Sequence, residues 1–355
     1  MIFAWASAWL LRRSAVGGAL AVGALLTVLD WVNFTAVPIW GTAQSFARPW
    51  SQHPGLILFV SFTGITGILF MLGTAQALVV NIIVRPKQRL RLLTAGVAVG
   101  LIFLTANVIV RTRPATARLK VAAVGWTSKD LVEYGDVHNR DGFAKLFAQP
   151  VAQAAGLGAR LIVFPEMGFY LARSNGAELL ERFGQIARRH DVFLAIGCFR
   201  EAEQENRLLF ISPQGTIVAE YTKTHLTPFE DSRKGNGRPV IIDVEGVRVG
   251  GMICQDDNFT SLSRGYGRRR TSLVAVPTLD WRVVRNVHFQ SSIHRAIESR
   301  YAIVRAAANG ISAIISPMGR VLARRDHFEQ GSGAIVAEAP LYADRTFFSI
   351  LGHWP

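Results

Sequence analysis

Long runs without any charged residue occupy most of the first 110 positions, and they limit this chain more than any other feature. The hydrocarbon core of a bilayer needs about 20 predominantly apolar residues per helix. A cleaved signal peptide does not explain the first run, because two more follow it. The sequence therefore predicts three membrane spans. They are expected at about Ala15–Pro38, Gly55–Val84 and Leu92–Val110.

The charge is distributed as unevenly as the apolar residues. The formal net charge is +14 and the mean hydropathy is +0.25. Residues 1–113 contain nine of the 39 Lys and Arg residues but only one of the 25 acids. The excess of basic charge thus lies mostly beside membrane segments, where it sets topology. It does not indicate nucleic-acid binding.

The positions of the basic clusters predict the orientation. Arg12 and Arg13 precede the first span, and the basic stretch Arg85–Arg91 separates the second from the third. Both clusters are expected in the cytoplasm, so the third span delivers the rest of the chain to the outer side of the cell membrane. The basic residues in the joint Arg111–Arg118 oppose this orientation, although large domains cross largely regardless of charge.

Asp30 is the single acid of the membrane part. An ionisable residue within a span is a functional candidate by default. It lies near the outer end of its span, beside Trp31 and Asn33, and we therefore expect a solvated aspartate at the interface.

From Leu119 onward, short apolar runs alternate with amphipathic patterns, which is typical of an α/β fold. The sequence is therefore divided into a transmembrane helical region, residues 1–113, and an α/β domain, residues 119–355. The expected strands are Leu119–Gly125, Arg160–Phe164, Val192–Cys198, Leu208–Ser212, Ile217–Tyr221, Val240–Val244, Val247–Ile253, Ser272–Val276 and Ser312–Ser316. The expected helices are Gly142–Ala155, Ala177–His190 and Val287–Ala308.

Three of these strands end on residues that can carry chemistry. Cys254 follows a buried run and is either a nucleophile or a small buried apolar residue. Glu166 ends a second strand and suits a general base, because a carboxylate in a partly dry site has its pKa raised toward neutrality. Lys223 ends a third strand and suits stabilisation of an oxyanion and of a thiolate. Either of the last two could instead be an ordinary surface residue.

Taken in chain order, these three strand ends resemble the carbon–nitrogen hydrolase (nitrilase) superfamily, and within it the apolipoprotein N-acyltransferases. The stretches that carry the resemblance are Phe164–Glu166, Lys223–Phe229, Ile253–Cys254, Arg295–Glu298, Arg305–Gly310 and Ser316–Val321.

The resemblance implies a four-layer αββα sandwich with the catalytic Glu166, Lys223 and Cys254 at strand ends. By this resemblance, Cys254 takes a fatty acyl chain from a phospholipid as a thioester and passes it to the N-terminal amine of an apolipoprotein. No cofactor or metal is implied. Two alternatives stay open: a membrane-tethered amidase that uses the same three groups with water, and a catalytically idle scaffold.

The chain departs from the family pattern in the supporting acids. The family carries a Glu after the lysine motif, where this chain has Glu230 and Asp231; Asp231 is in register, but we favour Glu230 for its longer side chain. The family also has an aromatic residue and a Glu directly after the cysteine, where this chain has Gln255 and the shorter acid Asp256. Asp280 and Trp281 look like a contracted form of a further family loop. We also expect a membrane part that lacks the family's first spans and its last one.

The remaining candidates are given structural roles. Cys198 is expected to be a buried core thiol, although a Cys198–Cys254 disulfide is possible outside the cytoplasm. His225 is expected to position the lysine motif. No Cys/His cluster has the spacing of zinc ligands, and no glycine-rich phosphate loop is present.

Overall fold

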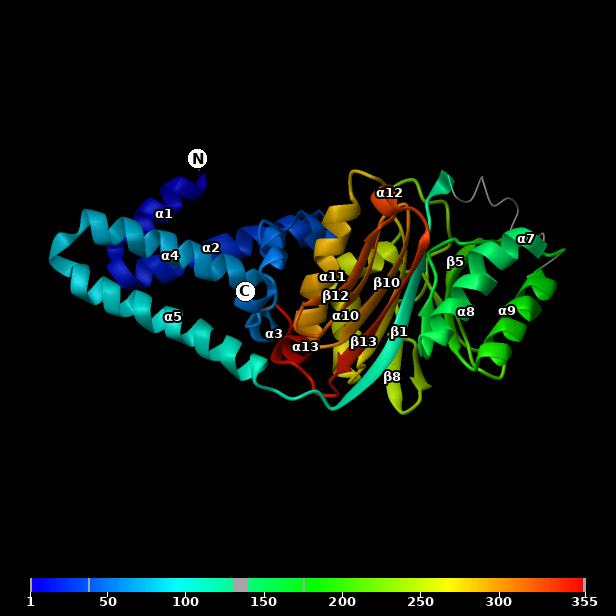
Figure 1. Ribbon diagram of the computed structural model, residues 1–355. Coiled ribbons are helices and arrows are strands. Elements are labelled where there is room, and N and C mark those ends of the chain that lie inside the picture. The colour runs from blue at the N-terminus through cyan, green and yellow to red at the C-terminus, as the bar shows by residue number, and fades with distance from the viewer. Residues whose placement is uncertain (1, 38, 130–139, 175, 354–355) are drawn as a thin grey trace.

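The computed structural model describes residues 2–37, 39–129, 140–174 and 176–353. A bundle of long helices extends to one side of two packed β-sheets, which have further helices on their outer faces (Figure 1). The long helices are α2 (Ala15–Ala36), α4 (Thr66–Val84) and α5 (Arg89–Arg111), preceded by the shorter α1 (Ile2–Arg13). In the described residues, three helical stretches, α2, α4 and 86–111, are long and apolar enough to cross a membrane.

The first and third expected spans match α2 and α5, with Pro38 outside the described residues. The second expected span, Gly55–Val84, is wrong in its first part. The chain there forms the short helices η3 (Pro54–Leu56) and α3 (Val60–Thr63) and then turns at Gly64, whose φ is +73°. Only α4 remains as a long helix. An uncharged run alone could not reveal the break, because residues 57–60 are buried in the same apolar core as the sheets.

Small residues bring α2 and α4 together. A Cβ added to Gly73 would lie 3.0 Å from the Cα of Gly23, so the two backbones approach too closely for larger side chains. This is the usual way in which helices associate in lipid, where no hydrophobic force drives them together.

Asp30 was expected to be a solvated aspartate at the interface, and the structure shows that this expectation is wrong. Its side chain is fully buried. It accepts hydrogen bonds from the Ser45 hydroxyl at 2.6 Å and from the Phe46 backbone N–H at 3.1 Å. It therefore ties the end of α2 to the loop that follows. The sequence placed Asp30 near the end of a span, but it could not show that this loop folds back over it.

The two basic clusters lie together at the end of the bundle that is remote from the sheets (Figure 1). Arg85 follows α4 and donates a hydrogen bond to the Leu11 carbonyl of α1 at 2.5 Å. The end of α5 at Arg111, by contrast, leads directly into the first strand.

The two sheets are described strand by strand in spatial order. The first contains β13 (Gly333–Leu341), β1 (Ala117–Gly125), β2 (Leu161–Val163), β4 (Phe193–Arg200), β5 (Glu205–Ile211) and β6 (Ile217–Thr222), with β3 (Tyr170–Leu171) paired to β4. The second contains β12 (Val321–Asp326), β11 (Ile311–Ile315), β10 (Ala302–Ala308), β9 (Leu273–Leu279), β8 (Val247–Gly251) and β7 (Ile241–Val244).

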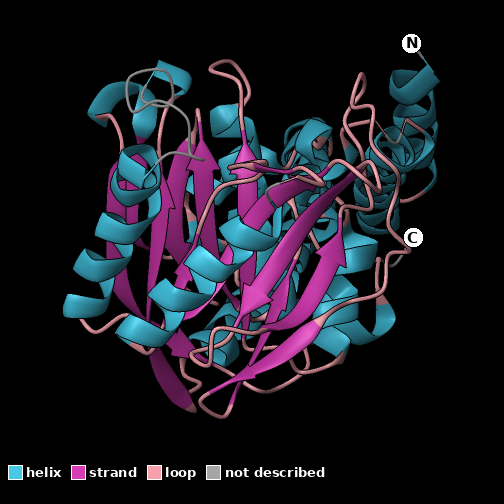
Figure 2. Ribbon diagram, turned by 90° about the vertical axis from the view of Figure 1, so that its right-hand side faces the viewer, coloured by secondary structure: helices cyan, strands magenta, loops and turns pink. Residues whose placement is uncertain are grey.

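Helices cover the outer faces of this sandwich. α7 (Arg140–Phe143), the π-helix η5 (Ala144–Ala148), α8 (Gln149–Gly156) and α9 (Gly176–His190) lie on the first sheet, and α10 (Thr260–Arg268) and α11 (Arg285–Ser299) on the second (Figures 1 and 2). The short helices α12 (His327–Gln330) and α13 (Phe347–Leu351) lie near the end of the chain. The expected αββα arrangement is confirmed.

Side chains alternate between the two faces of β1, so this one strand contributes to two apolar cores. Val121 and Ala123 face the second sheet, whereas Ala122 and Val124 face the helices α8 and α9. Successive side chains of a strand point to opposite faces, and both faces are covered here, so the strand reads as one continuous apolar run.

The expected helix Val287–Ala308 is wrong in its second half. α11 ends at Ser299, Arg300 takes a left-handed conformation, and β10 follows. Arg300 has φ +55°, a conformation that stops a helix and that no sequence pattern marks. The sequence prediction also omitted β3, β10, β12, β13 and α10.

Candidate active site

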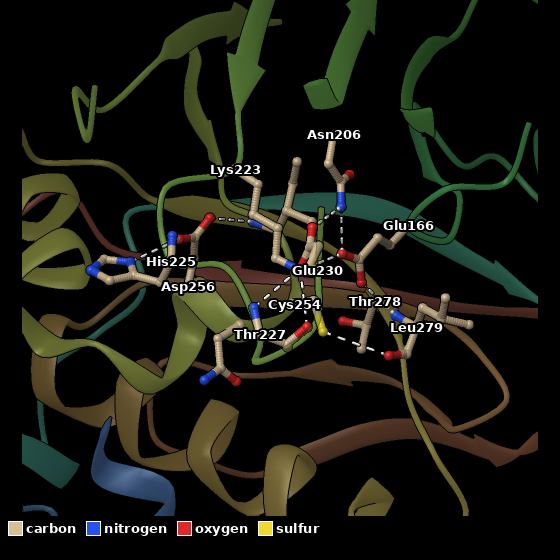
Figure 3. A network of polar contacts seen from close by, with 12 residues as sticks. Glu166, Asn206, Lys223, His225, Thr227, Glu230, Cys254, Asp256, Thr278 and Leu279 are labelled. Carbon is tan, nitrogen blue, oxygen red and sulfur yellow. Dashed lines mark hydrogen bonds and ion pairs between the residues drawn. The ribbon is translucent and has the colours of Figure 1, made fainter. Parts of the chain in front are cut away.

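The ends of four strands meet at one edge of the sandwich. β2 runs parallel to its neighbours β1 and β4, and β8 runs parallel to β9. The carboxyl ends of parallel strands lie at the same edge of a sheet. Glu166 follows β2, Lys223 follows β6, Cys254 follows β8 and Leu279 ends β9. Figure 3 shows the side chains of Glu166, Lys223 and Cys254 pointing toward one another, with the backbone of Leu279 beside them.

Glu166 and Lys223 form a buried ion pair. The Lys223 Nζ lies 2.7 Å from the Glu166 carboxylate, and the two side chains are 2% and 3% exposed. The other Glu166 oxygen accepts the Leu279 backbone N–H at 2.8 Å. The Leu279 carbonyl also accepts a hydrogen bond from the Cys254 thiol, with 3.7 Å between Sγ and the oxygen. The peptide of Leu279 thus fixes the carboxylate and the thiol relative to each other.

Lys223 has a second carboxylate partner, Glu230, at 2.6 Å. Burial by itself lowers the pKa of Lys223, but the charges of Glu166, Cys254 and Glu230 outweigh it and raise that pKa. Burial also raises the pKa of Glu230, yet the nearby ammonium outweighs this and lowers it. Lys223 is therefore a fixed positive charge within the site.

Burial raises the pKa of the Cys254 thiol well above its ordinary value, and the charge of Glu166 raises it further. Lys223 acts in the opposite direction. The resting sulfur is thus a thiol, so a nearby base must take its proton for the sulfur to attack. Glu166 is a carboxylate near this sulfur that can take the proton. Lys223 carries the positive charge that favours the thiolate.

Non-glycine residues in the left-handed region occur in three of the site's turns. Met167 directly follows Glu166 with φ +50°, Phe229 precedes Glu230 with φ +73°, and Cys254 itself has φ +45°. Such conformations are costly for a residue with a Cβ and persist where the surroundings enforce them. The sandwich therefore holds each of these side chains at a sharp, fixed bend.

Phe229 explains how the acid after the lysine motif reaches the site. Its backbone turns Glu230 inward, where Glu230 accepts hydrogen bonds from Lys223, from Asn206 at 3.0 Å and from the Thr227 N–H at 3.1 Å. Asp231 lies on the exposed side of the same turn. The structure thus brings Glu230 to the predicted site, and it does not bring Asp231.

Asp256 joins the lysine loop to the cysteine loop. This fully buried carboxylate accepts the backbone N–H of His225 and the His225 Nδ1–H, each at 2.8 Å. It also accepts the Tyr221 hydroxyl at 2.7 Å and the Ile253 N–H at 3.2 Å. The His225 ring stacks on Phe259, with 3.8 Å between the centroids. Both residues are therefore placed to position the loops, as the sequence suggested for His225.

Asn206 is the buried contact that the sequence prediction missed. It lies on β5 and donates to Glu166 at 2.8 Å and to Glu230 at 3.0 Å, so it bridges the two carboxylates. The predicted strand began two residues later, at Leu208, and this left Asn206 in a loop. Its neighbours Glu205 and Arg207 are charged and only partly buried, so no local pattern marked Asn206 as a buried residue.

The two cysteines are unpaired and belong to different apolar clusters, so the structure does not contain the possible disulfide. Cys198 lies in the core beneath α8 and α9, where burial raises its pKa to about 12. Its expected place as a core thiol is confirmed.

One group in the described part of the chain has the composition of a metal site, and spacing along the sequence could not reveal it. Ligand atoms of Cys254, Asp280 and His288 lie within 4.8 Å of one another. The carboxylate of Asp280 is already occupied, however, by His288 Nδ1 at 2.8 Å and by Arg305 at 2.7 Å. His288, Asp280 and Arg305 thus form a hydrogen-bonded chain beside Cys254.

The loop that carries Cys254 is attached to the segment that directly follows α2. Gln255 donates to the Ile39 carbonyl at 2.5 Å, and the Thr42 hydroxyl donates to the Asn258 carbonyl at 2.8 Å. A Cβ on Gly41, which has φ +51°, would lie 2.5 Å from that same Asn258 oxygen. The nucleophile loop and the end of a long apolar helix therefore form one tightly packed unit.

The fold and these strand-end residues can be compared with known proteins. A family model described as carbon-nitrogen hydrolase matches residues 120–343, which is more than half of the chain. The chain belongs to the carbon–nitrogen hydrolase family. This agrees with the superfamily that the sequence resembled.

Relatives of two kinds match this carbon–nitrogen hydrolase. Deaminated glutathione amidase from Mus musculus is 28% identical over 246 residues, which cover 58% of this chain and 75% of the amidase. Apolipoprotein N-acyltransferase from Neisseria meningitidis serogroup A is 24% identical over 360 residues, which cover 89% of this chain and 69% of the acyltransferase. The solved amidase from Nesterenkonia sp. AN1 in complex with acrylamide aligns with a TM-score of 0.55 at 20% identity and covers 64% of this chain and 93% of its own. That last likeness concerns the fold alone.

Proposed function

We propose that this carbon–nitrogen hydrolase is a membrane-bound N-acyltransferase that moves a fatty acyl chain from a phospholipid to the N-terminal amine of an apolipoprotein. Residues 1–113 form its membrane region and residues 119–355 its catalytic domain. The observation that carries the proposal is the attachment of the Cys254 loop to the end of α2 through Gln255 and Thr42. An enzyme that takes its acyl group from a lipid must hold the thiol beside the bilayer, and an attachment to the end of an apolar helix supports such a placement.

The extent of the similarities supports the same choice. A match over 89% of the chain necessarily includes most of the apolar helices, whereas a match over 58% need not include any of them. The acyltransferase of Neisseria meningitidis is therefore similar to this chain in its membrane region as well as in its sandwich.

The proposed roles follow from the contacts of each group. Glu166 takes the Cys254 proton as the sulfur attacks the ester carbonyl of the phospholipid, and Lys223 stabilises the negative charge that develops on the carbonyl oxygen. The C–O bond breaks, the lysophospholipid leaves with a proton from Glu166, and the acyl chain stays on the sulfur. The amine of the acceptor then attacks the thioester and releases the thiol.

The decisive experiment follows the acyl chain by mass. Purified protein incubated with phospholipid and no acceptor is expected to gain one fatty acyl mass on the peptide that contains Cys254. A diacylated lipopeptide with a free amine should then discharge the thioester, and the lipopeptide should carry the fatty acyl group as an amide. A thiol that never acylates, in a protein that releases amines or ammonia from small amides, would replace this proposal by the amidase alternative. Silence in both assays would favour the idle scaffold.

Topology gives an independent prediction. The basic residues at the end of the bundle remote from the sheets favour a cytoplasmic location for that end. Reporter fusions within Arg85–Arg91 are expected to report the cytoplasm, and fusions after Arg113 the outer side of the membrane. The reverse pattern would remove apolipoprotein acylation from consideration, since the proposal requires the sandwich to lie outside the cytoplasm.

A further inference from the structure

His288 is a buried histidine beside the thiol that the Glu166–Lys223–Cys254 chemistry does not use. It lies in the first turns of α11, on the face that packs against the sheet, together with Ser292 and Arg295. One of its ring nitrogens lies within 4.8 Å of the Cys254 Sγ. Its Nδ1 lies 2.8 Å from the Asp280 carboxylate. A histidine oriented by an aspartate near a thiol is an arrangement that can accept and return protons.

Asp280 is held as a carboxylate by its neighbours. Burial raises the pKa of Asp280, but the guanidinium of Arg305 at 2.7 Å and the contact with His288 outweigh it and lower that pKa. An anionic Asp280 accepts the Nδ1–H of His288, and this tautomer leaves Nε2 as the atom with a free lone pair. The aspartate therefore sets which nitrogen of the imidazole can take a proton.

Asp280 and His288 form a dyad, and this dyad and Glu166 are connected through the peptide group of Leu279. Leu279 donates its N–H to Glu166 and accepts the Cys254 thiol at its carbonyl, and Asp280 is the next residue. Both oxygens of Glu166 are already occupied by Lys223, Asn206 and Leu279. His288 is a further group near the sulfur that can accept a proton, and it is linked through Asp280 to the same peptide.

A cavity open to solvent is lined in part by Asp280, the partner of His288. This cavity has a volume of about 560 Å³ and is lined by Ser128, Asp280, Trp281 and Asn309 among others. Trp281 also packs against Trp40 at the end of α2, with 6.4 Å between the ring centroids. An acceptor in this cavity lies beside Asp280, the residue that orients His288.

We propose that His288, oriented by Asp280, is the proton acceptor for the nucleophile that discharges the acylated Cys254. The inference rests on the proposed covalent role of Cys254, and it holds for an amine or for water as the acceptor. The attacking nitrogen forms a bond to the thioester carbonyl carbon, and one of its protons passes to the imidazole. The C–S bond then breaks, the sulfur leaves as a thiolate, and the imidazolium returns the proton to it. An acceptor that arrives as an ammonium first loses one proton to solvent.

The test separates acylation from discharge. Cys254 is first acylated with p-nitrophenyl butyrate, a donor that does not depend on the natural lipid, and the loss of the butyryl mass is then followed after addition of glycinamide. His288→Gln is expected to acylate at nearly the wild-type rate and to discharge roughly 10²-fold more slowly, which is the usual size of a lost general base. His190→Gln, on the surface of α9, is the matched control and should discharge normally.

Two further readouts distinguish proton transfer from a structural role. Discharge of the wild type should slow as the pH falls, because a protonated general base can no longer accept a proton. The charged groups around it are Asp280, Asp257, Arg305 and Cys254. His288→Gln should lose this acidic limb. Added imidazole should accelerate discharge of His288→Ala beyond its effect on the wild type.

The opposite results are equally clear. Discharge of His288→Gln at the wild-type rate would overturn the inference. So would equal slowing of acylation and discharge with an unchanged pH profile and no rescue, since this would mark a structural residue. If p-nitrophenyl butyrate acylates the protein but phospholipid does not, the proposed function is contradicted. The role of His288 in discharge would still be supported.

Discussion

Cys254→Ser is expected to abolish turnover, with a loss of at least roughly 10³-fold, because removal of a nucleophile forfeits the covalent route. The hydroxyl of serine is a far weaker nucleophile than a thiolate, and the site is built around a sulfur. Cys254 is 4% exposed and lies at a bend with φ +45°, so serine fits the same space. The measurement is the acyl mass on the Cys254 peptide together with the rate of amide formation.

Cys198→Ser is the matched control for this variant. It places the same hydroxyl in the core beneath α8 and α9, where a polar group without a partner costs about 1–3 kcal/mol. We expect a lower melting temperature with most of the activity retained, the reverse of the result for Cys254→Ser. Equal activity of the wild type and Cys254→Ser would end the interpretation of the protein as an enzyme that acts through this thiol.

The strand-end positions of Glu166, Lys223 and Cys254 could be inferred from the sequence because each follows a buried apolar run, and such runs are local. Their convergence came from the resemblance, since no local pattern states which strands are neighbours. Their catalytic roles stay predictions. Asn206 and His288 were not found, because the residues that make them notable, Glu166 for Asn206 and Cys254 for His288, are distant in the sequence and neither residue lies in a motif.

The errors in the fold have a common physical origin. At Gly64 and at Arg300 a left-handed residue ends a helix, while the apolar pattern continues on both sides. Hydrophobicity reports burial, and burial continues across such a turn. The span Gly55–Val84 and the helix Val287–Ala308 were therefore each predicted too long. Asp30 was misplaced for a related reason, since its cover is formed by Ser45 and Phe46 from a loop that folds back.

Glu230→Gln is expected to lower the rate of acyl transfer by roughly 10²-fold, as the loss of a preorganised charge in an active site commonly does. Glu230 is one of two carboxylates that hold the Lys223 ammonium, at 2.6 Å. The glutamine removes the negative charge and can turn an NH₂ group toward the ammonium. Asp231→Asn, at the exposed neighbour, should change the rate by no more than about 2-fold, since surface substitutions rarely cost more than about 0.5 kcal/mol.

Stability against pH tests the same contact without any assay of activity. The pKa of Glu230 is lowered from its ordinary value of 4.5, so its charge stabilises the fold above that pH and ceases to do so as the pH falls through the folded pKa. The melting temperature of Glu230→Gln should therefore lie below that of the wild type at neutral pH, and the gap should narrow on acidification. Asp231→Asn should show no such gap. If Asp231→Asn instead loses activity while Glu230→Gln keeps it, the acid in family register is the functional one, and the inward turn at Phe229 has no role in catalysis.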